Sequence, residues 1–337
     1  MAKTDARGVG DSPTIKKYID KSPLEELVRR ALNREAPVTN ILIKALSPNA
    51  FIDPLPPSGS IGFKSIPVIT MSQGLYRVRS TGGVFDVSVE DSGDDVIAVG
   101  YIELILEGSG LTILRIPENP AHRIMGIKVT VVKGVDHEVL LIHKSGRRAM
   151  DLSEIVVEQG DASSLALVAL FNTGSILQAR VESIQGAGSS MKKTILVNST
   201  RGSRVEVEDY SYMDNPGASM ESYIRSRLEG GSMAVLRGRG IVSRRASGSR
   251  IVYGIESLIN DAESTAYMHP FLDIHSNDIV EARHYARNYL LTMDKLFYIE
   301  TRGLKPEEAA MLLVHGFLTR GLSKTVREII LSNISSS

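Results

Sequence analysis

The side chains of this sequence that can do metal or acid–base chemistry are histidines and carboxylates, because its 337 residues include no cysteine. The lack of cysteine excludes disulfides, thiolate nucleophiles, and zinc or iron–sulfur sites built from thiolates of this chain alone. Three of the seven histidines, His269, His275 and His284, lie close together in the sequence. Neutral imidazole is the commonest protein metal ligand, but a lone histidine is more often a structural residue. The spacing alone therefore leaves their role open.

A second candidate for chemistry is the stretch 206–214, which gathers acidic and aromatic residues: Glu206, Glu208, Asp209, Tyr210, Tyr212 and Asp214. Two carboxylates across a saccharide groove can serve as acid and base in glycosidic chemistry. The alternative is that these residues form the polar outer face of a sheet, and this alternative is favoured.

The stretch 225–250 is basic and contains one acid, Glu229, among seven arginines: Arg225, Arg227, Arg237, Arg239, Arg244, Arg245 and Arg250. It predicts either a face for an acidic partner or nucleic acid, or arginines that pair with acids on neighbouring strands, such as Glu206 and Glu208. Few aromatic residues are interleaved for base stacking, which favours the second interpretation. Lys+Arg and Asp+Glu are equal at 39 each, so we expect no nucleic-acid partner.

The signatures of several common enzyme classes are missing. The sequence has no G-x-x-x-x-G-K-[ST] phosphate-binding loop, no complete dinucleotide fingerprint, no zinc-protease H-E-x-x-H and no G-x-S-x-G nucleophile elbow. It also has no apolar run of membrane length, and its first residues are polar. We therefore expect a cytoplasmic protein that is neither an ATPase nor a membrane protein.

The elements that would position these residues are strands over most of the chain. From about 61 to 283, short runs of Val, Ile and Leu alternate with polar residues, as at 85–89, 128–132 and 205–208. Alternation with a period of two is the strand signal.

Glycines recur at a regular interval within this region. The positions 146, 160, 174, 188 and 202 are each 14 apart, and glycines follow at 217, 231 and 248. A corner every 14 residues predicts a unit of two strands of about five residues and two turns, which must stack on its neighbours to bury its apolar face. The pattern therefore predicts a β-helix, and a meander or sandwich of hairpins is the alternative.

The two ends of the chain carry helical patterns. We predict an N-terminal helical region at 1–55, a β-helix core at 60–285 and a C-terminal helical region at 290–337, with a boundary at the proline-rich residues 54–59. Three C-terminal helices are expected to begin near Thr292 or Asp294, at Pro306 and at Ser323, and Gly303 and Gly321 end the first two.

An ordered set of short motifs near the C-terminus resembles a known family. These are Pro-Phe-Leu-Asp-Ile at 270–274, His284, Leu-Phe-Tyr at 296–298, Arg-Gly-Leu at 302–304, and the spaced residues of 308–317. Together they are similar to the C-terminal signature of the SufB/SufD family of iron–sulfur cluster assembly proteins. Weaker similarity, mainly the glycine-paced strands, extends back to about residue 60.

The resemblance implies a mainly β fold, a right-handed parallel β-helix flanked by N- and C-terminal helical regions. It also implies that a SufC-type ATPase docks on the C-terminal helices and that two β-helix subunits pair near their C-terminal ends, where the cluster forms. The partner would be a SufB-type paralogue or a second copy of this chain. The positions that correspond to ATPase-binding residues are Leu296, Phe297, Tyr298, Arg302, Gly303, Leu304, Leu313, Gly316 and Phe317.

The resemblance further distinguishes two types of subunit. SufB-type members place a cysteine on a late strand and a His-Glu pair further on. Here the match of 257–259 to the family's Ser-Leu-Leu puts Ile255 at the cysteine position, and Tyr285 follows His284. This is the SufD-type pattern. It implies that His284 is a ligand of an interface cluster, with a hydrogen-bonding interface histidine as the alternative.

The leading hypothesis is therefore a non-enzymatic, SufD-like scaffold subunit. No cofactor is expected to bind this chain alone, because a thiolate-based cluster shared at the interface would need sulfur ligands from the partner. The competing hypotheses are a β-helix polysaccharide lyase or hydrolase that uses the acids of 206–214, and a purely structural β-helix homodimer.

Overall fold

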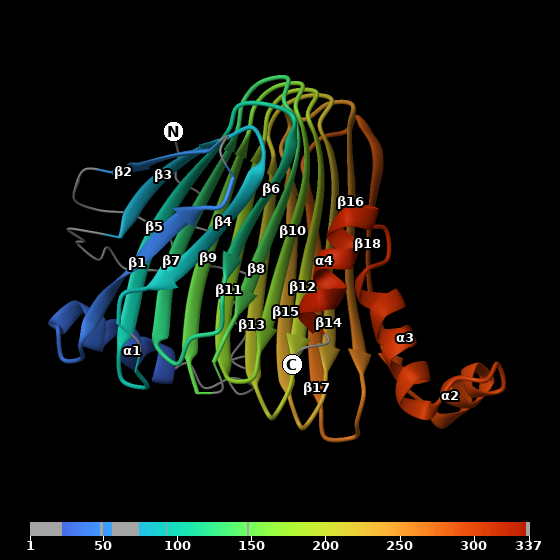
Figure 1. The fold of residues 1–337 in the computed structure, drawn as a ribbon. Coiled ribbons are helices and arrows are strands. Elements are labelled where there is room, and N and C mark those ends of the chain that lie inside the picture. The colour runs from blue at the N-terminus through green and yellow to red at the C-terminus, as the bar shows by residue number, and fades with distance from the viewer. Residues whose placement is uncertain (1–21, 48–49, 56–73, 92, 147, 335–337) are drawn as a thin grey trace.

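The computed structural model describes residues 22–47, 50–55, 74–91, 93–146 and 148–334. It is mainly β, with 57% of residues in strands, and its strands form a parallel β-solenoid of about eight turns with helices at both ends (Figure 1). The predicted β-helix is thus confirmed. No helix in the described parts of the chain is long and apolar enough to cross a membrane.

The elements follow in chain order. They are α1 (Ser22–Asn33), β1 (Val38–Ala45), β2 (Ala50–Pro54), β3 (Leu75–Ser80), β4 (Gly83–Val89), β5 (Ile97–Leu106), β6 (Gly110–Ile116), β7 (His122–Val131), β8 (Asp136–Lys144), β9 (Met150–Gln159), β10 (Ser164–Thr173), β11 (Ile176–Gln185), β12 (Ser190–Ser199), β13 (Arg204–Met213), β14 (Ser219–Leu228), β15 (Met233–Val242), β16 (Ser249–Ile259), β17 (Thr265–Ile274), β18 (Ile279–Leu290), α2 (Met293–Glu300), α3 (Pro306–Leu318) and α4 (Lys324–Ile334).

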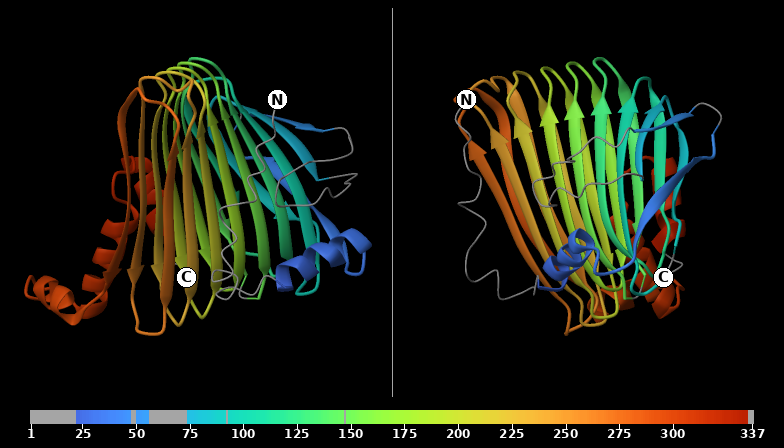
Figure 2. Two further views of the ribbon diagram at one scale, coloured as in Figure 1. Left: turned by 180° about the vertical axis from the view of Figure 1, so that it is seen from behind. Right: turned by 90° about the vertical axis from the view of Figure 1, so that its left-hand side faces the viewer.

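The strands form two facing sheets, because from β3 onward each strand pairs in parallel with the strand two places along the chain. Odd-numbered strands from β3 to β17 form one sheet, and even-numbered strands from β4 to β18 form the other. Figure 2 shows one sheet face-on in its right view. Hairpins would pair consecutive strands in antiparallel fashion, which among the described residues only β2 and β3 do, so the meander alternative is wrong.

One turn of the solenoid, called a coil below, is twice as long as the glycine spacing. Ser190 pairs with Ser164, which lies 26 residues earlier, and Arg250 pairs with Ser219, 31 residues earlier. The predicted unit of two five-residue strands is therefore wrong. Each 14-residue unit holds one strand of about ten residues and one turn, and two such units complete a coil.

The regularly spaced glycines are required for two different reasons. Gly188 and Gly202 have φ values of 61° and 72°, in the left-handed region that side chains disfavour. Gly160 has no positive φ, but a Cβ there would lie 2.7 Å from the backbone nitrogen of Lys133 on the preceding coil. Turn geometry explains the first two glycines, and close stacking of coils explains the third.

The main core fills the space between the two sheets. Inward side chains such as Leu167, Val197 and Val207 are fully buried there. A second cluster lies outside the even-numbered sheet, where Val326 and Ile330 of α4 cover strands β8, β10 and β12. A third lies beneath α1, on the outside of the odd-numbered sheet.

The N-terminal region is not wholly helical, so the prediction for 1–55 is corrected. Helix α1 is present, but β1 and β2 follow it, and 1–21 lie outside the described residues. β1 is bonded to both sheets, antiparallel to β4 and parallel to β5. Its fully buried Ile41 fills the lumen opposite Gly100, where a Cβ would collide with it. β1 is a strand because its alternating Ile41 and Ile43 close this end of the core.

The three predicted C-terminal helices are present. Gly303 and Gly321 have φ values of 92° and 76°, as expected for residues that end helices. The Oγ atom of Ser323 accepts a hydrogen bond from the Val326 amide at 3.4 Å, so Ser323 caps α4 as predicted. α3 and α4 lie against the even-numbered sheet, and α2 projects away from the β-helix (Figure 1).

Candidate functional site

In the described part of the chain, no further strand pairs with β17 or β18, so the C-terminal end of the β-helix is called the open end. Among the described residues, β17 has a ladder partner on one side only, β15, and β18 likewise pairs only with β16. Large apolar side chains are exposed on these strands, with exposed fractions of 44% for Phe271 and 54% for Leu290. Unpaired strand edges of this kind are templates for pairing with another chain.

His284 lies at this open end. It pairs in register with Tyr253, whose side chain is in the core between the sheets, so His284 faces the same side of the sheet. No strand stacks beyond β18 among the described residues, and the His284 side chain is exposed. An imidazole in this position is available to a partner that pairs with β18.

Ile255, the position that the resemblance assigns to a cysteine, lies on the neighbouring strand β16. It pairs with Ala286, two residues beyond His284, and faces the same lumen. Ile255 is fully buried. The structure therefore brings the two positions close together, but the one on β16 carries an aliphatic side chain in the core.

The three neighbouring histidines do not converge. His269 on β17 pairs with Arg237 and faces the outside of the odd-numbered sheet, and the His275 ring lies 3.0 Å from Asp273. Across the described residues, no group of three His, Cys, Asp or Glu side chains is arranged to hold a metal ion. Any metal ligation by His284 would need further ligands from a partner.

The acids of 206–214 are divided between two faces of β13. Glu206 and Glu208 face outward, and both form ion pairs with Arg237. The guanidinium of Arg237 lies 2.8 Å from the carboxylate of Glu208. Asp209 faces inward and pairs with Lys193. The carboxylates nearest in sequence are thus separated by the sheet or neutralised by an arginine.

Arginines of the basic stretch form ion pairs with acids on neighbouring strands or turns, which confirms the second interpretation of this stretch. The pairs link Arg225 to Glu256, Arg237 to Glu206 and Glu208, Arg239 to Asp273, Arg245 to Asp214, and Arg250 to Glu221 and Glu281. These pairs balance much of the charge that an acidic partner would need.

The lumen contains a buried polar network that the sequence analysis missed. The ammonium of Lys193 lies 2.5 Å from Asp209 and donates to Ser183 at 2.8 Å and Ser211 at 3.0 Å. Asp209 also accepts hydrogen bonds from Ser222, at 2.6 Å, and from the Tyr253 hydroxyl. Burial lowers the pKa of Lys193, and burial together with the Asp209 charge raises the pKa of Tyr253.

This network approaches the open end along a single row of inward positions. Lys193, Ser222, Tyr253 and His284 are successive register partners on β12, β14, β16 and β18. The Tyr253 ring lies over Gly238, where a Cβ would collide with it. The lumen below His284 therefore contains a buried ion pair and its hydrogen-bond partners.

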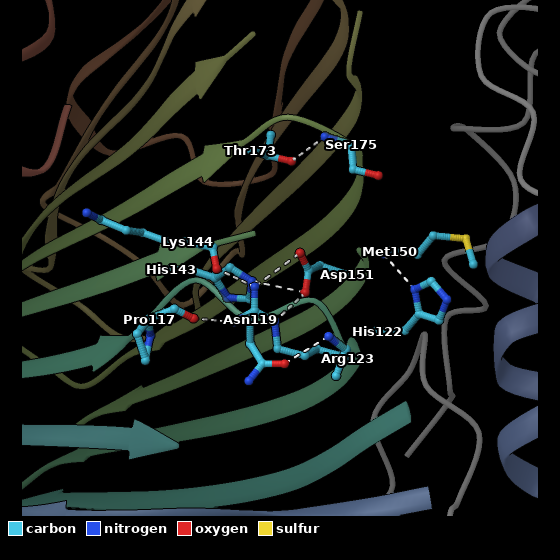
Figure 3. Close-up of polar contacts among 11 residues, drawn as sticks. Pro117, Asn119, His122, Arg123, His143, Lys144, Met150, Asp151, Thr173 and Ser175 are labelled. Atoms are coloured by element: carbon cyan, nitrogen blue, oxygen red, sulfur yellow. Dashed lines mark hydrogen bonds and ion pairs between the residues drawn. The ribbon is translucent and has the colours of Figure 1, made fainter. Parts of the chain in front are cut away.

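A second buried cluster lies at a corner of the β-helix near β7, β8 and β9 (Figure 3). Arg123 donates to Asp151 at 2.7 Å and to the Pro117 carbonyl at 2.9 Å, and the His143 ring lies 3.3 Å from Asp151. Burial alone would raise the pKa of Asp151, but Arg123 and His143 lower it below its usual range. Burial and the Arg123 charge lower the pKa of His143. The cluster fastens successive coils together.

The predicted ATPase-binding residues separate into two groups. Phe297 and Tyr298 on α2 are 67% and 64% exposed, and Leu304 is 36% exposed. Gly316 and Arg302 are also exposed, and the Arg302 guanidinium lies 5.5 Å from the Tyr298 ring centroid. Leu296 and Leu313 are half-buried.

Phe317 belongs to the attachment of the helices rather than to their free face. It packs against the second apolar cluster, with its ring edge-on to Tyr289 of β18 at 5.6 Å. The free face instead includes Met311 and Leu312, at 48% and 54% exposure, which were not among the predicted docking residues. The exposed arm is defined here as α2 and the first half of α3, with Phe297, Tyr298, Leu304, Met311 and Leu312 on its surface.

Comparison with known proteins identifies the family. The family model described as "SUF system FeS cluster assembly, SufBD core domain" matches residues 111–317. Iron–sulfur cluster assembly SufBD family proteins of Staphylococcus aureus (strain USA300) and Staphylococcus epidermidis (strain RP62A) are each 31% identical over 103 residues, and the Staphylococcus saprophyticus protein is 32% identical over 103 residues. The alignments cover 31% of this chain and 22% of each relative. The matched part thus spans about a fifth of those longer proteins.

The family match covers more than half of the chain and includes most of both sheets, the open end and the whole exposed arm. The predicted resemblance is confirmed at the level of the family. This chain belongs to the SufBD family of iron–sulfur cluster assembly proteins.

Proposed function

We propose that this chain is a SufD-like scaffold subunit whose open end pairs with a SufB-type subunit. The observation that most strongly supports this proposal is the state of the last coil. There β17 and β18 each have a ladder partner on one side only, and both carry exposed apolar side chains. Strand pairing with another chain would satisfy these edges and cover Phe271 and Leu290. A SufB-type partner is favoured over a second copy because a thiolate-based cluster needs sulfur ligands, and this chain has no cysteine.

In this proposal the cluster is the cargo of the complex, and His284 contributes one nitrogen ligand at the interface. Its exposed position at the mouth of the lumen supports this role. The adjacent Ile255 cannot ligate iron, so the partner supplies the remaining ligands. The chain itself carries out no catalysis in this scheme.

The exposed arm is proposed to bind a SufC-type ATPase. Its five apolar side chains are held on a helical pair that projects from the β-helix, so a partner can reach them (Figure 1). Aromatic residues such as Phe297 and Tyr298 frequently dominate the energetics of an interface.

Pairing is tested by Ala286→Arg, which places a bulky charge at the exposed mouth of the lumen. Ala262, exposed in the turn between β16 and β17, gives the matched control Ala262→Arg. We expect Ala286→Arg to weaken binding of the SufB-type subunit by about tenfold or more in a pull-down titration. Equal binding by both variants would refute pairing at this end, and failure of the unaltered chain to bind the SufB-type subunit would refute the heterodimer.

Docking is tested by Phe297→Asp, with Phe51→Asp as the control, because Phe51 is similarly exposed at 70% on β2. We expect only Phe297→Asp to abolish capture of the ATPase. The role of His284 is tested by His284→Ala in the reconstituted complex, where cluster yield should fall while subunit assembly is unchanged. An unchanged cluster yield would remove His284 from the site.

A further inference from the structure

One buried carboxylate joins the turn after α3 to the last coils of the β-helix. Glu256 on β16 is fully buried. It accepts hydrogen bonds from Arg225 on β14 at 3.2 Å, from the Tyr289 hydroxyl on β18 at 3.4 Å, and from Arg320, which follows α3. The Glu256 side chain thus joins strands β14, β16 and β18 to the residues that follow α3.

A hydrogen bond to a backbone carbonyl and an aromatic contact also join the helices to the last coils near Glu256. Arg225 donates a hydrogen bond to the Arg320 carbonyl at 2.7 Å. Tyr289, which reaches Glu256, also packs edge-on against Phe317 at the end of α3. Arg225, Glu256, Tyr289 and Arg320 are called the latch cluster below.

The other polar contacts at the turn between α3 and α4 reach earlier strands. Lys192 on β12 donates to the Gly321 carbonyl at 2.7 Å, and Ser323 donates to Glu138 on β8 at 2.9 Å. These contacts, and the apolar packing of α4, hold the helices to the middle of the β-helix. Glu256 lies further along, one residue from Ile255 and one strand from His284.

The two arginines in the latch cluster are not equivalent. The Arg225 side chain is 5% exposed and the Arg320 side chain is 50% exposed. If Arg320 moves into solvent, Glu256 and Arg225 remain as a balanced buried pair. If Arg225 were lost, its own buried position would be vacated and Glu256 would keep one half-exposed partner. Breaking a buried pair costs far more than opening an exposed contact.

The charges around the carboxylate favour release of one arginine. Two guanidinium groups share one carboxylate, and burial together with the Arg320 charge lowers the pKa of Arg225. The hydrogen bond to Glu256 raises the pKa of Arg320. The two guanidinium groups repel each other across the carboxylate that they share. When Arg320 withdraws, the loss of its ion pair with Glu256 is therefore partly offset by relief of this repulsion.

We propose that Arg320 is a releasable latch through which displacement of the exposed arm reaches strands β16 and β18 at the open end. The proposal rests on docking of an ATPase to the arm, because that partner would supply the displacement. Arg320 acts as a positioning residue: it touches neither cargo nor nucleotide, and it sets how firmly the helices are coupled to the strands that carry Ile255 and His284. Small shifts at a bistable contact of this kind can be amplified across an interface.

The releasable character is tested in the isolated full chain by urea unfolding of Arg320→Gln and Arg225→Gln. We expect the shift in midpoint for Arg320→Gln to be less than about a third of that for Arg225→Gln, because only the second vacates a buried position. Equal shifts, or a larger shift for Arg320→Gln, would overturn the latch whether or not an ATPase binds.

Transmission is tested in the complex with the SufC-type ATPase by hydrogen–deuterium exchange of residues 279–290. In the unaltered chain, we expect ATP to change the exchange rate of this segment by about threefold or more. Arg320→Gln should bind the ATPase equally well but lose this response. Arg327→Gln, at an exposed position of α4, is the matched control and should retain it.

The outcomes separate the latch from the proposed docking. Failure of the unaltered chain to capture the ATPase overturns the docking proposal and, with it, transmission through the arm. Capture without an ATP-dependent change in residues 279–290, or a response retained by Arg320→Gln, overturns the latch alone.

Discussion

The two ends of the β-helix differ in how their last strands are satisfied. At the N-terminal end, β1 bonds to both sheets and inserts Ile41 into the lumen. At the C-terminal end, β17 and β18 each have a ladder partner on one side only among the described residues, and the side chains of β18 are half-buried or exposed. A solenoid needs a cap at each end. In the proposed complex, the partner subunit would provide the cap at the C-terminal end.

The lumen changes character between the same two ends. Near β1 most of its side chains are apolar, as with Ile41, Val78 and Phe85, and the polar ones there are uncharged partners such as Ser80 and Thr112, which hydrogen-bond to each other. Toward the open end it contains the Lys193–Asp209 pair and its serine and tyrosine partners. A buried ion pair is weak evidence for stability, because apolar residues of similar volume often do as well.

The largest expected effect comes from breaking the lumen ion pair. Lys193→Met would leave the buried Asp209 carboxylate without its counter-charge and should lower the free energy of unfolding by about 3–5 kcal/mol. Urea unfolding followed by circular dichroism measures the change. The double variant Lys193→Met with Asp209→Leu should recover most of the loss. A single variant as stable as the unaltered chain would show that the pair is not charged in the folded state.

The next effect tests the closed end. Ile41→Ala removes a fully buried side chain from the lumen and should cost about 2–4 kcal/mol of unfolding free energy. The matched truncation at the open end is Leu290→Ala, where the side chain is 54% exposed. It should cost less than about 1 kcal/mol in the isolated chain. Similar losses at the two positions would contradict the contrast between a closed end and an open end.

A smaller effect concerns pH and the buried histidines of the earlier coils. Burial lowers the pKa of His122, His137 and His143 from the usual value of 6.5. The unfolded chain therefore binds more protons than the folded chain below about pH 6.5, so the free energy of unfolding should fall as pH drops, by up to about 1.4 kcal/mol per pH unit for each histidine.

The lowered pKa of Asp151 acts in the same direction at more acid pH, because the unfolded carboxyl takes up its proton first. His143→Gln isolates one contribution and should make the pH dependence between 7 and 5 shallower by up to one proton. A variant with an unchanged slope would show that His143 is protonated equally in both states.

The smallest expected effect is at an exposed ion pair. Arg245 and Asp214 link neighbouring turns, with side chains 74% and 42% exposed. Arg245→Gln should change the unfolding free energy by less than about 1 kcal/mol. A loss comparable to that of Lys193→Met would contradict the view that burial, rather than charge pairing as such, sets the cost.

The fold was predictable because two periodicities agree. The alternation of residues such as those at 205–208 predicts strands, and the glycine spacing predicts a corner every 14 residues. The number of strands per coil was not predictable from this spacing, because one ten-residue strand and two five-residue strands fill the same length. The strand β1 was missed because the apolar Leu42 interrupts the alternation of Ile41 and Ile43, and β2 was missed because it has only five residues.

Parts of the site carry a signal in hindsight, and others do not. Lys193 falls at an inward position in the alternation of Met191, Ile195 and Val197, which marks it as a buried charge. The pairing of Arg123 with Asp151 depends on how a corner folds, and the pairing of Glu256 with Arg320 depends on how α3 packs. Neither follows from local sequence, because each joins segments that only the tertiary structure brings together.

The proposed complex requires that this chain joins a SufB-type partner at its open end. Hydrogen–deuterium exchange with and without that partner tests it directly. We expect amides of residues 279–290 to become protected on complex formation, while those of residues 38–54 at the closed end do not change. Protection at the closed end, or no protection of 279–290 in a complex that forms, would contradict it.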